Sequence, residues 1–282
     1  MLGSAKELVQ CLKMTNEENS SFHIGTSTLK LSSKIWSEPE IEKAIDLYVK
    51  LPFGRIHSRN PDIVELANQL GRTPSAIALK LSNLASLDET IDRKGMSHAS
   101  KLDRIVWQNF FEGLQRVSSE IDNFETDNKL AGLREKQQSE YVVPVMAGET
   151  TPRTTQSRIG QQFFRQMILA SYDYKCAMTG IAQPELLVAG HIRPWSKDKS
   201  NRMNPHNGIC LNRLHDKAFE EKLISFEADG KILYSNRLKP ETRRKMQSID
   251  ETGYFQFPKK FKPDLNFLAE HRNEFQLLET SS

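Results

Sequence analysis

The stretch that decides the fold is GHIRPWSKDKSNRMNPHNGICLNRLHDKAFE, residues 190–220. It overlaps LLVAGHI (186–192), a short apolar run of the kind that is typical of a strand. After a polar, irregular loop, GICL (208–211) predicts a second short strand, and residues 212–221 predict a helix. The order is therefore strand, loop, strand, helix.

Three polar residues stand at the junctions of these elements. His191 ends the first strand, Asn207 begins the second, and His215 lies one turn into the helix. A neutral imidazole can remove a proton from an attacking water, which makes His191 a candidate general base. A metal that polarises a phosphate needs nitrogen or oxygen ligands, and His215 is placed to offer one. The amide of Asn207 can hold the loop by hydrogen bonds and so keep the base aimed.

The segment resembles the HNH endonuclease motif, the ββα-metal finger, and in particular a restriction-type branch of that family. The resemblance extends from RIGQQFFR, which starts at residue 158, through CAMTG to FLAEHRNEF, which ends at residue 275. It implies that His191 is the general base, Asn207 the middle residue of the motif, and His215 a metal ligand. It also implies a divalent metal cofactor, with Mg²⁺ as the first choice and Mn²⁺ or another transition metal as alternatives.

The residue before the base departs from the family pattern. Many members carry Asp or His there as a second metal ligand, whereas this chain has Gly190, which cannot ligate. Asp216 adjoins His215 but points about 100° away around the helix, which makes it a weaker ligand candidate. Waters and phosphate oxygens can complete the shell of a Mg²⁺ ion. Cys176 and Cys210 lack CxxC partners, which argues against a structural zinc and favours two small buried hydrophobes.

The formal net charge of +3 hides an uneven distribution. Residues 151–245 carry 17 Lys and Arg against 9 Asp and Glu, a net charge of +8. A basic region favours a polyanionic partner, and beside a candidate phosphodiesterase site that partner is double-stranded DNA. Lys197, Lys199 and Arg213 flank the motif, and the basic residues of this half that we expect to contact DNA are Arg158, Arg165, Arg193 and Arg202.

Residues 36–116 show helical spacing throughout. Ser37 is a candidate N-cap for a helix that runs to about residue 49. DIVELANQLGRTPSAIALKLSNL (62–84) predicts two helices joined by a turn at Gly71, a spacing typical of a helix-turn-helix. We expect the second helix to expose Ser75 and Lys80 to the major groove. A further helix follows over residues 100–114, and an all-helical packing unit without a ligand is the alternative.

These segments predict an α+β chain. An all-α, helix-turn-helix-like DNA-reading domain (36–116) is joined to a ββα-metal nuclease domain (158–282). Residues 1–35 predict a flexible arm, and the polar residues 117–157 predict a linker. Within the nuclease domain, Asp229-Gly230 predicts a hairpin turn.

The composition excludes several classes of protein. No run of about eighteen apolar residues occurs, so a membrane partner is not expected. The start, MLGSAKELVQCLKM, lacks the long apolar stretch of a secretory signal, and the three cysteines lie far apart. Both observations favour a reduced, cytoplasmic protein.

The sequence thus predicts a metal-dependent endodeoxyribonuclease of restriction type, in which base modification either directs or blocks cutting. Because one HNH site cuts one strand, double-strand cutting favours a homodimer. Two alternatives remain open: a DNA-binding regulator with an inactive nuclease fold, and a nicking or homing nuclease.

Overall fold

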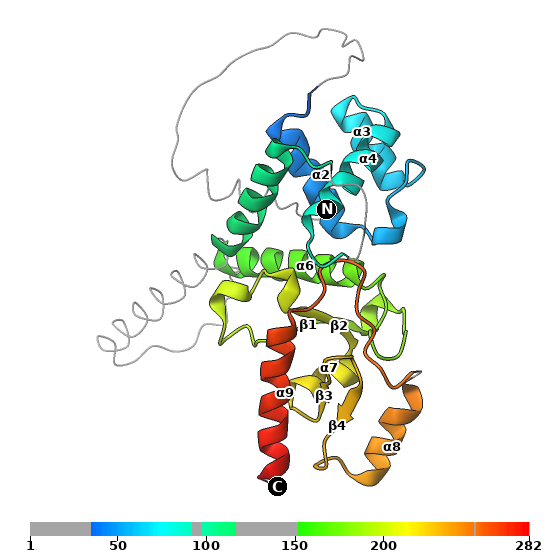
Figure 1. Ribbon diagram of the computed structural model, residues 1–282, viewed down its shortest axis with the longest axis vertical. Coiled ribbons are helices and arrows are strands. Elements are labelled where there is room, and N and C mark those ends of the chain that lie inside the picture. The colour runs from blue at the N-terminus through cyan, green and yellow to red at the C-terminus, as the bar shows by residue number, and fades with distance from the viewer. Residues whose placement is uncertain (1–34, 92–97, 117–151, 251, 282) are drawn as a thin grey trace, which may run out of the picture.

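The computed structural model describes residues 35–91, 98–116, 152–250 and 252–281 (Figure 1). The predicted flexible arm therefore lies outside the described residues except at residue 35. Residues 117–151 of the predicted linker also lie outside them. Among the described residues, no helix combines the length and apolarity needed to cross a membrane.

The N-terminal half is helical, as predicted. Its helices are α2 (Glu38–Lys50), α3 (Pro61–Leu70), α4 (Pro74–Leu84) and a helix over residues 101–116. At the start of α2, the backbone N–H of Ser37 donates to the Glu40 carboxylate at 2.9 Å, which confirms the predicted cap. Gly71 ends α3 in the left-handed conformation with φ of 61°, and Thr73 caps α4 by accepting from the Ala76 N–H.

The expected exposure of Lys80 is wrong. The Lys80 side chain is only 8% exposed, and its Nζ is 2.7 Å from Asp103 Oδ1 on the 101–116 helix. It also lies over the ring of Trp36. Ser75 is exposed as predicted. The one charged residue of α4 therefore holds two helices together and does not point outward.

The C-terminal half contains two small antiparallel sheets wrapped by helices. Strand β1 (Leu187–His191) pairs with β2 (Gly208–Asn212), and helix α7 (Arg213–Glu220) follows directly, so the predicted order of elements is confirmed. A second hairpin pairs β3 (Ile224–Phe226) with β4 (Ile232–Tyr234), and Gly230 takes a φ of 89° in its turn, as predicted. The remaining helices are α6 (Pro152–Ser171), α8 (Pro240–Ile249) and α9 (Leu265–Thr280). Short 3₁₀ turns lie at η1 (Phe53–Arg55), η2 (Ala85–Leu87), η3 (Pro184–Leu186), η4 (Lys199–Asn201) and η5 (Pro205–Asn207).

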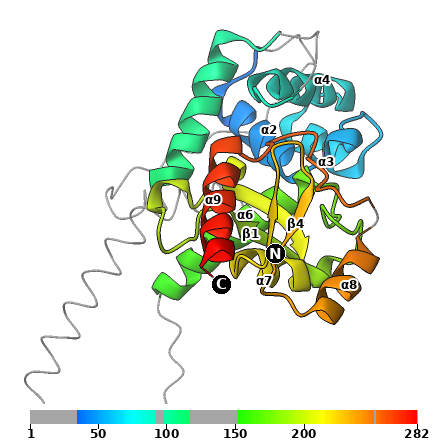
Figure 2. The ribbon, with the colours of Figure 1, turned by 60° about the horizontal axis from the view of Figure 1, so that its bottom comes forward.

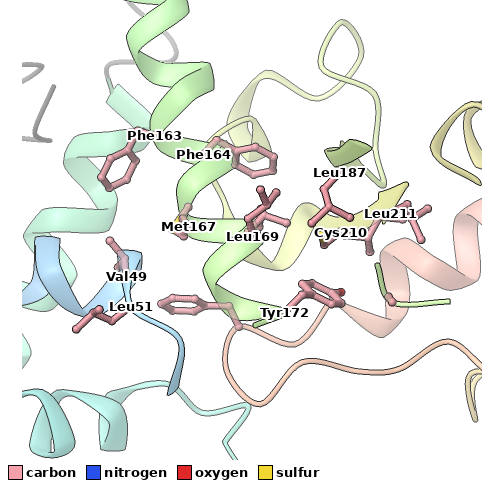
Figure 3. Close-up of a cluster of buried hydrophobic side chains, with 14 of the residues drawn as sticks. Val49, Leu51, Phe163, Phe164, Met167, Leu169, Tyr172, Leu187, Cys210 and Leu211 are labelled. Carbon is pink, nitrogen blue, oxygen red and sulfur yellow. The ribbon is translucent and has the colours of Figure 1, made fainter. Parts of the chain in front are cut away.

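Helix α6 joins the two halves through one apolar core. It begins at Pro152, inside the stretch predicted to be a linker. Figure 3 shows Val49 and Leu51 of the N-terminal half facing Phe163 and Met167 of α6, while Leu187 of β1 lies on the other side of the helix. All five side chains are buried. The hydrophobic core is therefore continuous from α2 to the β1–β2 hairpin.

The chain between α8 and α9 ties the halves together a second time. In both ribbon views it runs up to the N-terminal helices before it returns into α9 (Figures 1 and 2). Lys260 on this segment is fully buried, and its Nζ donates to the carbonyls of Tyr48, Val49 and Leu51 at 2.6, 3.1 and 2.7 Å. The ring of Phe261 packs against Tyr48. The C-terminal half thus caps the carboxyl end of α2.

Candidate active site

His191 lies at the end of β1 in a pocket of rings. Its imidazole is stacked on Phe164 of α6, with ring centroids 4.0 Å apart, and meets Trp195 edge-on. Its Nε2 is 2.9 Å from the carbonyl oxygen of Arg202. Because a carbonyl only accepts hydrogen bonds, Nε2 carries the proton and Nδ1 carries the lone pair. The geometry therefore fixes one tautomer and leaves Nδ1 as the basic atom.

The surroundings of His191 also set its charge. Burial lowers the pKa of the imidazole below its ordinary value, an effect larger than the opposing hydrogen bond to Arg202. The side chain is consequently neutral at pH 7. A neutral histidine with a defined lone pair is the form that can accept a proton.

Asn207 holds the loop between β1 and β2. Its side chain is 0% exposed, and its Oδ1 accepts from the Arg193 N–H at 2.8 Å. Its Nδ2 donates to the carbonyls of Arg193 and Asn201, each at 3.1 Å. The amide thus links Arg193, at the start of the loop, to Asn201, in its middle. Arg193 lies two residues after His191. This is the positioning geometry expected from the sequence.

His215 occupies a different environment from the one expected. It is 0% exposed, and its Nδ1 is 2.9 Å from Asn212 Nδ2, whose Oδ1 accepts the His215 N–H. Since that amide nitrogen can only donate, Nδ1 is the acceptor and Nε2 carries the proton. Nε2 faces Asp250 Oδ1 at 3.5 Å. Neither nitrogen offers a lone pair to an ion, which argues against the predicted ligand role.

The pair of His215 and Asp250 is buried without other partners. Neither Nε2 nor the two carboxylate oxygens makes a hydrogen bond within the described part of the chain. Burial lowers the pKa of His215 to about 4 and raises that of Asp250 to about 6. Asp250 follows α8, well outside the motif, and no local pattern in the sequence points to it.

Asp216 turns its carboxylate to the end of β1. A Cβ at Gly190 would overlap with Asp216 Oδ1, so any other residue there would require the Asp216 carboxylate to turn away. Asp216 is half-buried, and burial raises its pKa to about 6. No hydrogen bond or ion pair to another described residue satisfies this carboxylate. The residue before His191 and the residue after His215 therefore meet.

Three of the four predicted DNA-contacting arginines make hydrogen bonds or ion pairs within the fold, so these three guanidinium groups are not free as expected. Arg165 donates to the carbonyls of Pro184 and Leu187. Arg193 pairs with Asp198 and Glu270, and Arg202 is 4% exposed, with its Nε donating to the Trp195 carbonyl. The side chain of Arg158 lies outside the described part of the structure. The high density of positive charge predicted that these guanidinium groups contact DNA. Their hydrogen bonds to carbonyls and carboxylates instead stabilise the fold.

Cys176 and Cys210 are buried free thiols. Cys176 Sγ accepts from the backbone N–H of Asn212 at 3.3 Å, and burial raises the pKa of Cys210 to about 12. Both side chains belong to the apolar core, as the sequence predicted.

Comparison with known proteins matches residues 176–227 to the HNH endonuclease family. This segment is an HNH endonuclease domain. It contains the β1–β2 hairpin, α7 and β3, and with them His191, Asn207 and Asp216. No curated protein matches the chain. The match supports nuclease activity in general, because HNH domains are nuclease domains.

HNH nucleases generally depend on a divalent metal. No group of three or more His, Cys, Asp or Glu side chains in the described residues is arranged to hold an ion. A hard cation such as Mg²⁺, however, is commonly bound by one or two carboxylates and several waters or phosphate oxygens. The Asp216 carboxylate, which lies against Gly190 and makes no hydrogen bond with another described residue, fits that chemistry.

Proposed function

We propose that this chain is a metal-dependent endonuclease that hydrolyses phosphodiester bonds in double-stranded DNA. The observation that carries the proposal is the state of His191. The Arg202 carbonyl fixes its tautomer, Phe164 fixes its ring plane, and burial keeps it neutral. These are the properties that a general base needs.

The proposed step uses water as the nucleophile. Nδ1 of His191 takes a proton from a water whose oxygen forms a bond to phosphorus, while the bond from phosphorus to the 3′ oxygen breaks. Asn207 keeps the loop after His191 in place, so that the imidazole stays aimed at the water. When bound, a divalent metal polarises the phosphate and stabilises the negative charge on the departing oxygen. Asp216 is the residue that would hold it.

Phosphate contacts would come from exposed cations rather than from Arg165, Arg193 and Arg202, which have partners within the fold. Lys197 and Arg213 are exposed near the motif, and both can contact phosphates. Such contacts add affinity without reading sequence. We propose that the helical N-terminal half, which presents Ser75, selects the site in a restriction-type enzyme. The pairing of a helical unit with a nuclease domain supports this part of the proposal by analogy.

The test is incubation of the full chain with modified and unmodified supercoiled plasmid in Mg²⁺, Mn²⁺ or EDTA. We expect nicked or linear products with a metal and none with EDTA. Linear product in a single event supports the homodimer, whereas nicked product alone supports a nicking enzyme. Binding of DNA without cleavage under every metal condition would contradict the proposal and favour a DNA-binding regulator.

A further inference from the structure

A cavity of about 830 Å³ lies where the helical half meets the HNH domain, and we name it the junction cavity. Part of its wall comes from residues 87–90 and from the 101–116 helix. The rest comes from residues 203–206, in the loop between β1 and β2, and from residues 257–265, which lead into α9. Its volume falls in the range of about 300–1,000 Å³ that small-molecule sites occupy. The phosphodiester step proposed above does not use this cavity.

Aromatic rings from distant segments line the junction cavity. Trp107 and Phe111 come from the 101–116 helix, and Phe257 comes from the segment before α9. All three side chains are only half-buried, although they pack against the hydrophobic core. Ring surfaces that stay accessible in a cavity are places where a flat aromatic group can stack.

The polar groups of the cavity are mainly hydrogen-bond acceptors. Its lining includes four carboxylates, those of Asp88, Glu89, Glu112 and Asp264. The two aspartates already accept backbone N–H groups, whereas Glu89 and Glu112 are exposed. His206 adds a neutral acceptor. Its Nδ1 is 2.7 Å from a backbone carbonyl and therefore carries the proton, which leaves the lone pair on Nε2.

This excess of acceptors restricts the chemistry of a ligand. Among the described residues that line the cavity, Lys262 is the one lysine or arginine, so the carboxylates disfavour a phosphate group. A flat group that donates hydrogen bonds fits better. Cytosine and adenine each carry an exocyclic amine that donates to a carboxylate or an imidazole nitrogen, whereas thymine carries none.

The junction cavity shares a loop with the active site. Met203 and His206 line the cavity, and the residue before Met203 is Arg202, whose carbonyl lies 2.9 Å from His191 Nε2. Asn207, which ties the loop together, directly follows His206. A group that fills the cavity therefore contacts the loop that positions the proposed general base. This location favours a part of the nucleic-acid substrate over an unrelated amine.

We infer that the junction cavity binds an amino-bearing nucleobase, cytosine or adenine. The base stacks on Trp107 and Phe111 and donates its amine to His206 Nε2 or to the carboxylate of Glu89. The inference rests on the proposed function for DNA as the source of the base, since a base of a duplex reaches such a cavity only after it leaves the stack. A free nucleotide carries the same base, and the experiment distinguishes the two sources.

The test measures binding of bases without cleavage. Saturation-transfer NMR on the full chain in EDTA compares deoxycytidine, deoxyadenosine and thymidine. We expect deoxycytidine or deoxyadenosine to bind about tenfold more tightly than thymidine. A tetranucleotide of the preferred base and its 5′-monophosphate are then compared. Tighter binding of the tetranucleotide supports a base from DNA, and tighter binding of the monophosphate supports a base from a free nucleotide.

Two variants and a control assign the binding to the cavity. Phe111→Leu keeps an apolar side chain but removes a ring, and should weaken binding of the preferred nucleoside by about tenfold. Glu89→Gln changes an exposed acceptor and should narrow the difference from thymidine. Glu38→Gln, which changes an exposed carboxylate of α2 away from the cavity, should bind like the wild type. Circular dichroism and thermal melting establish that each variant is folded.

The possible failures can be told apart. Equal binding of the three nucleosides, binding of none of them, or unchanged binding in both cavity variants would overturn the inference. Binding of tetramethylammonium without any nucleoside would also overturn it, because the site would then be an amine site. Binding of a nucleoside in the cavity by a chain that cleaves no DNA under any metal condition would instead contradict the proposed function and leave the base site standing.

Discussion

Replacing Lys260 with methionine tests how firmly the two halves are joined. Methionine keeps most of the apolar stem but removes three hydrogen bonds to the end of α2, of 2.6, 3.1 and 2.7 Å. The carbonyl of Tyr48 retains a weaker bond from the Leu51 N–H at 3.4 Å, so the main loss falls on two carbonyls. Each buried carbonyl left without a hydrogen bond costs about 1–3 kcal/mol. The variant no longer buries an ammonium, which offsets part of this cost, so the expected loss of stability is about 3 kcal/mol.

The assay is equilibrium denaturation of the full chain. A loss of about 3 kcal/mol corresponds to a Tm lower by roughly 6–12 °C for a protein of this size. The control is Lys259→Met, which changes an exposed neighbour and should stay within about 0.5 kcal/mol of the wild type. If Lys260→Met also stays within that range, the claim that this side chain anchors the halves is refuted.

Three further predictions concern single side chains. Asn207→Ala should lower stability by about 2 kcal/mol and slow DNA cleavage, since three loop hydrogen bonds are lost; denaturation and cleavage rates measure both. Lys80→Ala should cost about 3–5 kcal/mol because Asp103 is left buried and unpaired, whereas Ser75→Ala should leave the melting curve unchanged. Burial lowers the pKa of His271 to about 3, so the unfolded chain binds more protons between pH 3 and 6.5, and stability falls as pH drops through that window. The free energy of unfolding of the wild type should fall between pH 8 and pH 5, and this fall should be about 2 kcal/mol smaller in His271→Gln. Denaturation at the two pH values measures the difference.

The ββα unit could be predicted because its information is local. β1, the loop, β2 and α7 follow one another in one short stretch, and Asn207, at the end of the loop, bonds to residues only 6 and 14 positions away. Strand alternation, the cap at Asn212 and the tight loop are all properties of neighbouring residues. Periodicity likewise predicted α2, α3 and α4, and Ser37 was predicted as the cap of α2.

The errors arose where a distant residue decides the environment. Nothing near Lys80 shows that Asp103 will meet it, and nothing near Arg193 shows that Glu270, 77 residues later, will neutralise it. The contact between Gly190 of β1 and Asp216 of α7 was not predicted either, because no local pattern in the sequence shows it. Lys260 reaches a carbonyl 212 residues away. A charged side chain reads as exposed from sequence alone, and only the tertiary fold reveals its partner.

The most direct test of the central claim is the single-turnover rate of DNA cleavage by His191→Ala, with DNA affinity measured on the same preparation. We expect a rate lower by about 10²–10⁴-fold, because proton transfer to Nδ1 is lost. We also expect nearly unchanged DNA affinity, since the half-buried ring contributes few contacts to phosphate. Cleavage by His191→Ala within about tenfold of the wild-type rate would contradict the claim that this histidine is the general base.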